Sequence, residues 1–322
     1  MPKREVHEQR EAPSVLRTIL TIIGIISGLL SLLFLGFIVF AVFAAFSAPT
    51  TFETGNVAWI PIRGVITTEA DAGAFTEAGV SSTDLVGWIK EAEADDSIRA
   101  VVFEIDSPGG TPVATEEIAT AIRNMEKPSV ALIREIGASG AYWVASATDR
   151  IFASRMSSVG SIGVLASYIE FAGTLQRYNA TYRSLTSGEF KDTGSPFKEL
   201  TAREEELFQR QLDKIHTIFI KAVAENRGLP EDKVRKLANG WIYLGEEALE
   251  FGLIDEIGNE DDVVAHLEEE LNTTVELVEF VPPITFFEEV FGLMREASFF
   301  MGKGIGTALT TPRLDNRARI YT

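Results

Sequence analysis

Residues 99–110, RAVVFEIDSPGG, carry the clearest indication of how this chain folds. Residues 99–106 are mostly apolar, with β-branched and aromatic side chains, which is typical of a short buried strand. The DSPGG at its end is a turn signal, because glycine lets the backbone reverse sharply and expose its N–H groups. Residues 111–126 then have a helical pattern, and residues 129–134 form the next apolar strand. Strands that alternate with helices predict an α/β domain with a mostly parallel sheet.

The same alternation continues on both sides of this segment. Upstream, residues 57–66 have a β pattern, and residues 82–96 begin with a Ser/Thr-Asp cap and have a helical pattern. Downstream, we expect a helix from about residue 139 and a long amphipathic helix over residues 201–226. The other downstream expectations are a strand at residues 151–153, a glycine-serine loop at 157–164 and a strand at 182–186.

An uncharged segment near the N-terminus predicts a membrane anchor. Residues 18–52 contain no charged residue, and a membrane span needs about 20 apolar residues. A cleavable signal peptide has a shorter apolar region of roughly 7–15 residues, so we expect an uncleaved transmembrane anchor at residues 18–48. Residues 1–17 carry four Lys and Arg residues, which predicts a cytoplasmic tail, a linker at residues 49–55 and an extracytoplasmic domain over residues 56–280. The predicted location is therefore the cell membrane, with the lipid bilayer as a partner.

The last part of the chain, residues 281–322, departs from the alternating pattern. It contains an apolar stretch that is interrupted by charged residues and is too polar to span a membrane. Such a segment is typical of a helix at the membrane surface or against a partner subunit, and equally of an ordinary buried amphipathic helix. We predict an amphipathic segment followed by a tail.

The overall composition excludes several functions. The formal net charge is −18, and a surface of this sign repels DNA and RNA, so no nucleic-acid partner is expected. The chain has no cysteine, which excludes disulfides, thiolate metal sites and a cysteine nucleophile. No cluster of potential ligands has metal-binding spacing and no phosphate-loop motif occurs, so neither a metal nor a cofactor is expected.

The segment GASGA, residues 137–141, is a candidate for nucleophilic chemistry. It places Ser139 between an apolar strand and an apolar helix, with small neighbours that leave room for a substrate carbonyl. The N-terminus of the helix would favour negative charge nearby. The alternative is a serine that only caps the helix. Similarly, the amides of the DSPGG segment, residues 106–110, could hold a developing oxyanion or could belong to a tight turn with no chemical role.

A serine nucleophile needs a base, and none of the three histidines has a setting that suggests catalysis. His7 lies in the predicted cytoplasmic tail, His216 lies inside the long helix and His266 lies in an acidic stretch. A lysine can replace imidazole where burial or neighbouring groups depress lysine pKa values toward neutrality. Lys191 differs from the other lysines because it lies in a short turn, SGEFKD. Its alternative role is a loop lysine paired with a neighbouring carboxylate.

Several motifs occur together in a characteristic order. They are DSPGG, GASGAYWVAS, IFASRMSSVGSIGV, SGEFKDTGSPF and ANGWIYLGEEALEFGLIDEIG. In this order they resemble signal peptide peptidase A, a family of the ClpP/crotonase superfamily, over roughly residues 56–280. The length resembles the short, single-domain form of that family. The resemblance implies an α/β spiral of the ClpP/crotonase type after an N-terminal transmembrane helix, and a serine protease that degrades signal peptides or other peptides near the membrane.

The resemblance also implies a role for individual residues. Ser139 corresponds to the nucleophile, Lys191 to the general base and Ser161 to a serine that orients the lysine amine. Gly110 and Gly140 correspond to the positions whose amides form the oxyanion hole. The family assembles into rings or domes, which implies a homo-oligomer, an octamer for the short form. In some short members the lysine reaches the serine of the adjacent subunit.

Apolar residues of the glycine-serine loop have two possible roles. Val159, Ile162 and Val164 could line an apolar pocket for small or aliphatic substrate side chains, or they could pack in the core.

Three other functions remain as alternatives. The crotonase fold also serves acyl-CoA chemistry, which the predicted extracytoplasmic location argues against. A membrane protease of the NfeD type also uses a Ser-Lys pair but usually carries further membrane spans. A membrane-anchored scaffold that kept the fold without catalysis is the third alternative.

Overall fold

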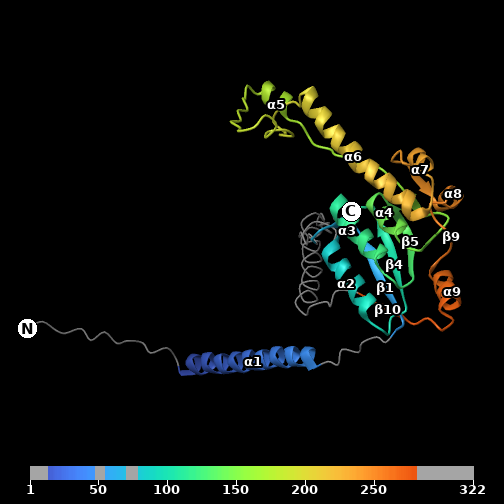
Figure 1. Ribbon diagram of the computed structural model, residues 1–322. Coiled ribbons are helices and arrows are strands. Elements are labelled where there is room, and N and C mark those ends of the chain that lie inside the picture. The colour runs from blue at the N-terminus through green and yellow to red at the C-terminus, as the bar shows by residue number, and fades with distance from the viewer. Residues whose placement is uncertain (1–13, 48–54, 70–78, 281–322) are drawn as a thin grey trace, which may run out of the picture. The chain divides into compact units, whose positions relative to one another are not determined.

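The computed structural model describes residues 14–47, 55–69 and 79–280, and these fall into two units (Figure 1). In the first unit the described element is α1, Ser14–Ser47. It contains a stretch of 21 residues, Arg17–Phe37, with a mean hydropathy of 2.5, long and apolar enough to cross a membrane. A single-pass anchor is consistent with this helix, and its orientation stays a prediction. The predicted N-terminal tail, linker and C-terminal segment lie wholly or almost wholly outside the described residues.

The second unit, residues 53–281, is built on a largely parallel sheet. Six strands run in the order β10-β1-β4-β5-β6-β9, and every neighbouring pair is parallel. Their bounds are β1 Val57–Arg63, β4 Ala100–Ser107, β5 Ser129–Ala138, β6 Arg150–Ala153, β9 Glu256–Ile257 and β10 Leu277–Glu279. Off this order, β7 (Ser158–Gly160) extends the far end of β5 in parallel and pairs antiparallel with β8 (Ile242–Leu244). A small parallel pair, β2 (Ile66–Thr67) and β3 (Val80–Ser81), lies beside the end of β4 through a bridge between Ile66 and Gly110.

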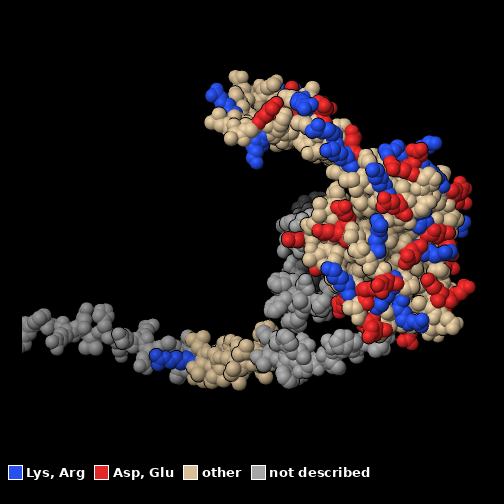
Figure 2. Space-filling view, in the orientation of Figure 1, with Lys and Arg blue, Asp and Glu red and all other residues tan. Residues whose placement is uncertain are grey.

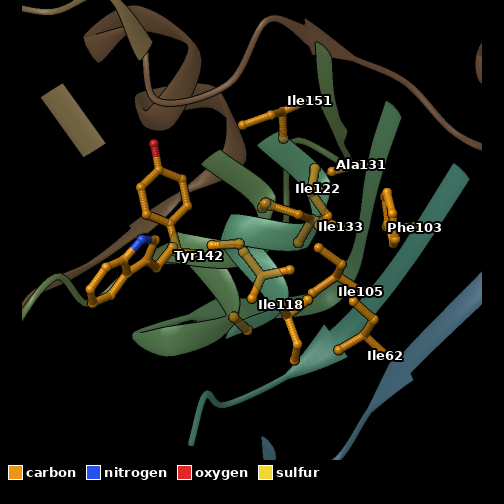
Figure 3. Packing of buried hydrophobic residues seen from close by; sticks show 14 of the residues in the cluster. Ile62, Phe103, Ile105, Ile118, Ile122, Ala131, Ile133, Tyr142 and Ile151 are labelled. Carbon is orange, nitrogen blue, oxygen red and sulfur yellow. The ribbon is translucent and has the colours of Figure 1, made fainter. Parts of the chain in front are cut away.

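Helices connect the strands and cover the sheet. They are α2 Ser82–Ala94, α3 Pro112–Arg123, α4 Gly140–Ser146, α5 Ala172–Arg177, α6 Ala202–Arg227, α7 Glu231–Leu237, α8 Gly245–Phe251 and α9 Glu260–Leu271. In β4, Val101, Phe103 and Ile105 enter the larger core cluster, which Figure 3 shows meeting Ile118 of α3 and Tyr142 of α4. The alternate residue Val102 enters a second cluster with side chains of α9. Both faces of β4 are therefore buried, which explains its nearly continuous apolar sequence.

Residues 166–201 leave the sheet unit as an extension that we call the arm. Figure 1 shows the arm, with α5, at the outer end of α6, while the inner end of α6 packs on α4 and α7. The arm exposes many large apolar side chains. Figure 2 shows separate basic and acidic groups on the arm, and acidic and basic side chains alternate over the visible face of the sheet unit. The exposed apolar side chains of the arm are Tyr168, Ile169, Phe171, Tyr178, Tyr182, Leu185, Phe190 and Phe197. Exposed apolar side chains gathered in one segment are typical of an interaction site.

The sequence predicted α1–α4, α6, β1, β4, β5 and β6, but not α5, α7–α9, β2, β3 or β8–β10. The glycine-serine segment at residues 157–164 was expected to be a loop, yet it contains β7, because its backbone pairs with both β5 and β8. A strand was expected at residues 182–186, but this part of the arm is irregular. No neighbouring strand is available there to satisfy its backbone groups, and instead Tyr182 and Ser184 donate side-chain hydrogen bonds to Asp192, at 2.9 and 2.7 Å. Its large side chains, Tyr182 and Leu185, are exposed and do not belong to a half-buried strand.

Candidate active site

The loops that follow β4 and β5 form the candidate site. These strands are adjacent and parallel, so their carboxyl ends lie at the same edge of the sheet, where α/β proteins generally bind ligands. β4 leads into the DSPGG loop and α3, and β5 leads through Ser139 into α4. A cavity of about 710 Å³ opens at this edge, and both Ser139 and Ser161 line it.

Ser139 has an unusual backbone conformation. Its φ of 53° and ψ of −125° place a residue with a Cβ in a region that costs energy and is concentrated at functional sites. The N–H of Ser139 donates to the carbonyl of Gly160 at 2.8 Å, which fixes the turn. Ser139 occupies the N-cap position of α4, yet its side chain makes no capping hydrogen bond. The geometry resembles the strained strand-to-helix turn that presents a nucleophilic serine in other hydrolases.

Two buried side chains hold α4 beneath this turn. The hydroxyl of Tyr142 donates to the carbonyl of Leu253 at 2.8 Å, and the Trp143 ring stacks on Phe219 of α6 with 5.0 Å between ring centroids. Trp143 and Phe219 also line the cavity. The helix that starts at Gly140 is therefore anchored to two other elements, which makes the position of Ser139 rigid.

The amides of Gly110 and Gly140 converge beside Ser139. A Cβ on Gly140 would lie 3.2 Å from the Gly110 nitrogen, and a Cβ on Gly109, whose φ is +103°, would lie 2.7 Å from the Gly140 nitrogen. The Gly110 N–H donates to no backbone group in the described parts of the chain, and Gly140 is the first residue of a helix, where N–H groups have no intrahelical acceptor. Two unused N–H donors thus lie together beside a serine, which is the arrangement of an oxyanion hole.

Ser161 lies on the neighbouring loop and is also held at positive φ, 49°. Its N–H donates to the carbonyl of Trp241 at 2.8 Å, and its hydroxyl donates to the carbonyl of Gly240 at 3.3 Å. The structure therefore brings Ser139, Ser161, Gly110 and Gly140 to one cavity.

Lys191 is in a different place. It lies in the arm, is exposed and does not line the Ser139 cavity. Within the described residues its ammonium forms no hydrogen bond or ion pair, so it is not the carboxylate-paired loop lysine that was the alternative. The adjacent Asp192 instead accepts hydrogen bonds from Tyr182 and Ser184. One chain alone therefore presents a free lysine on the arm and a free serine at the sheet edge.

Glu204, at the start of α6, fixes the loop that carries Lys191. Its carboxylate accepts hydrogen bonds from Thr193 at 2.9 Å, from Lys198 at 2.6 Å and from the N–H and hydroxyl of Thr201, both at 2.9 Å. These donors, Lys198 first, lower the pKa of Glu204 to about 2. A lowered pKa means that the network stabilises the fold above the ordinary carboxyl pKa of 4.5 and is lost as the pH falls toward 2.

We expect Glu204→Gln to loosen the arm at neutral pH without unfolding the sheet unit. The neutral amide has one acceptor oxygen and no charge, so it cannot replace the hydrogen bonds that the Glu204 carboxylate accepts. The arm should therefore open more often, and cleavage by trypsin at Lys191 and Lys198 should become faster by on the order of tenfold. Limited proteolysis with mass spectrometry measures this, and Glu205→Gln, an exposed neighbour, is the matched control. Equal cleavage of both variants would show that Glu204 does not hold the arm. Wild-type protein should show the same arm cleavage only as the pH approaches 2, with an acid-stable protease.

Two residues that the sequence did not single out also line the cavity. His216, predicted as an ordinary residue of the long helix, lies in α6 and faces the cavity, and its Nε2 is buried without a hydrogen-bond partner in the described chain. Thr115 of α3 also lines the cavity with a buried, unpartnered hydroxyl. The helical spacing of His216 and Phe219, three residues apart, is the only sequence signal that could have placed His216 on an inward-facing side.

The predicted pocket residues separate into two groups. Val159 and Ile162 are completely buried in the larger core cluster and do not line the cavity, whereas Val164 does. Val159 belongs to β7, which is paired on both sides, so its side chain points into the core. No group of three or more His, Cys, Asp or Glu in the described ranges is arranged to hold a metal ion.

Comparison with known proteins identifies the class of this chain. The sequence model of Peptidase family S49 matches residues 121–274. A protein of Methanocaldococcus jannaschii named "Putative protease MJ0651" is 34% identical over 240 residues, which cover 74% of this chain and 76% of that protein. "Putative signal peptide peptidase SppA" of Enterococcus faecium is 29% identical over 218 residues, 67% of this chain and 63% of that protein. "Protease 4" of Haemophilus influenzae is 29% identical over 203 residues, 62% of this chain but only 33% of that protein.

These matches make the chain a peptidase. It belongs to peptidase family S49, and the resemblance to signal peptide peptidase A that the motifs indicated is confirmed at the level of the family.

Proposed function

We propose that this peptidase is a membrane-anchored serine endopeptidase with a Ser139–Lys191 dyad. The observation that carries the proposal is Ser139 itself, held at positive φ at a strand-to-helix turn, free of any capping bond and beside two unused glycine amides. The mixed α/β sheet and its crossover helices are consistent with a spiral of the ClpP/crotonase type.

The proposed reaction follows from these groups. A neutral Lys191 amine removes the proton of Ser139 as its Oγ attacks a peptide carbonyl. The amides of Gly110 and Gly140 stabilise the oxyanion, and one such donor is typically worth about 10²–10³ in rate. The protonated amine then gives its proton to the leaving nitrogen, and a water activated by the same amine releases the acyl group. Ser161 holds the amine through its hydroxyl.

We propose that the lysine comes from a second copy of the chain. Lys191 does not line the Ser139 cavity of its own chain, and the arm that carries it exposes apolar side chains that remain unpartnered in a monomer. Contact with a second copy would cover this surface and remove water from the Lys191 amine, which favours its neutral form. The site is thus completed by a homo-oligomer, for which the family resemblance suggests an octamer.

The substrate class rests on the anchor and the cavity. A single apolar helix, α1, would keep the peptidase at a bilayer, with its N-terminus in the cytoplasm by the distribution of positive charges. The cavity has aromatic and aliphatic walls, including Trp143, Leu212 and Phe219, which suit apolar peptides. We therefore propose cleaved signal peptides, and other apolar peptides near the membrane, as substrates. An NfeD-type protease acting on one membrane protein is the alternative enzyme.

A second mechanism has one specific observation in its favour. His216 lines the same cavity as Ser139, and its Nε2 has no partner among the residues described. Within one chain it is therefore the available imidazole base, and it defines the competing hypothesis to Lys191.

The full-length protein in detergent micelles, tested on apolar peptides, distinguishes a protease from a scaffold. We expect hydrolysis of these peptides and stoichiometric labelling of Ser139 by a serine-directed acylating probe, located by mass spectrometry. Ser139→Ala should remain folded and unlabelled. Unlabelled Ser139 together with no hydrolysis would contradict the proposal and favour the scaffold.

A further inference from the structure

We propose that the Thr115 hydroxyl is a third hydrogen-bond donor to the oxyanion, beside the amides of Gly110 and Gly140. This inference rests on the proposed serine peptidase function and adds to it a side-chain group in the oxyanion hole.

Thr115 has a buried hydroxyl without a partner. The residue is 1% exposed, it lies in the first turns of α3, and its Oγ1 has no hydrogen-bond partner in the described part of the protein. A threonine inside a helix commonly turns its hydroxyl back to the carbonyl four residues earlier. Here the Thr111 carbonyl accepts only the Thr115 N–H, at 3.1 Å. The hydroxyl is thus left without an acceptor at the wall of the cavity that Thr115 lines.

The position of this hydroxyl relates it to the oxyanion amides. A Cβ on Gly140 would lie 2.4 Å from Thr115 Oγ1 and 3.2 Å from the Gly110 nitrogen. The hydroxyl and the Gly110 N–H therefore lie against the same side of Gly140, the residue that follows Ser139. The contact also explains why residue 140 must be glycine, since any side chain would collide with Oγ1 and fill the space between the donors.

The energetics favour a functional role. An unsatisfied buried hydroxyl destabilises a fold, and valine has the same shape without this cost. The described residues contain two other buried side-chain atoms without a partner, on Glu93 and His216. Glu93 does not line the cavity, and nothing places His216 against Gly140. Thr115 alone combines an unused hydroxyl with contact to the oxyanion site.

The test compares Thr115→Val with Thr115→Ser in the full-length protein in detergent. Valine keeps the volume and removes the hydroxyl, so kcat should fall by about 10²-fold with KM within about twofold, because the bond forms only as the oxyanion develops. The Tm of Thr115→Val should equal or exceed that of the wild type, since an unsatisfied polar group is removed. Thr115→Ser should keep most of the activity, because it retains the hydroxyl.

Three results would overturn the inference. The first is an unchanged kcat in Thr115→Val. The second is an equal loss in both variants, which would indicate that the site responds to any change of shape at residue 115 and not to the hydroxyl. The third is a rise in KM alone. Ser139→Ala, measured in parallel, separates this inference from the function on which it rests. If wild type cleaves peptides, Ser139→Ala does not and Thr115→Val cleaves like wild type, only the role of Thr115 is wrong. A wild type that cleaves nothing, or an active Ser139→Ala, overturns both.

Discussion

Replacing Lys191 by alanine is expected to lower kcat by about 10⁴-fold or more, because removal of the base from a nucleophile–base pair abolishes almost all of the covalent pathway. The exposed position of Lys191 in the arm means that the variant should fold normally and keep its Tm. Steady-state hydrolysis of an apolar peptide measures the loss. Retention of the Ser139 backbone turn and of the glycine amides should leave substrate binding in place.

His216→Gln is the matched control for this experiment. Because His216 lines the Ser139 cavity, it is the base that a single chain could offer. Glutamine is similar in size and can form hydrogen bonds, but it cannot accept a proton as a base. We expect this variant to keep peptidase activity within a few fold of wild type. An inactive His216→Gln beside an active Lys191→Ala would reverse the assignment of the base. The dependence of peptidase activity on pH also distinguishes the two bases. A lysine base predicts activity that rises into the alkaline range, whereas a histidine base predicts activity that reaches a plateau near neutrality.

Mixing two inactive variants is expected to restore activity if the dyad forms between subunits. Ser139→Ala chains supply Lys191, and Lys191→Ala chains supply Ser139. In a closed ring assembled at random from equal amounts, about a quarter of the interfaces join an intact lysine to an intact serine, so about a quarter of wild-type activity should return. Co-expression, or unfolding and refolding of the mixture, produces the mixed oligomers, and peptide hydrolysis measures the recovery.

The control is the double variant, Ser139→Ala with Lys191→Ala, mixed with Lys191→Ala alone. This mixture forms the same oligomers but contains no intact lysine, and it should remain inactive. Absence of recovery in the first mixture, with subunit exchange verified by two affinity tags, would place serine and lysine in one chain. The arm would then have to rearrange to bring Lys191 to the cavity.

The parts of the site that were predictable from sequence depend on local structure. The apolar residues before DSPGG predict the end of β4, and the small residues around Ser139 predict the end of β5. Parallel pairing of β4 with β5 then brings these two strand ends together. Lys191 shows the limit of such reasoning. Its turn was recognised, but the sequence does not say which way the arm extends, and the structure places it outside the cavity of its own chain.

What the sequence left open or missed has a common physical origin in side chains whose environment is set by distant segments. Val159 and Ile162 both lie in the core, and for Val159 the cause is the pairing of β7 with β5 and β8. His216 lies in a typical amphipathic helix, and the packing of α6 beside α4 places it in the wall of the cavity that Ser139 also lines. The segment at residues 182–186 was wrongly expected to be a strand, because the sequence does not show that no neighbouring strand lies beside it.

The distance that the arm keeps between Lys191 and its own Ser139 cavity has a consequence for a newly made chain. Where the base arrives from a neighbour, a chain freshly inserted into the bilayer is chemically harmless, because it carries a nucleophile that nothing can activate. Under the proposed arrangement, proteolysis would switch on with the local density of the enzyme, and neither a propeptide nor a separate inhibitor would be needed before the subunits assemble.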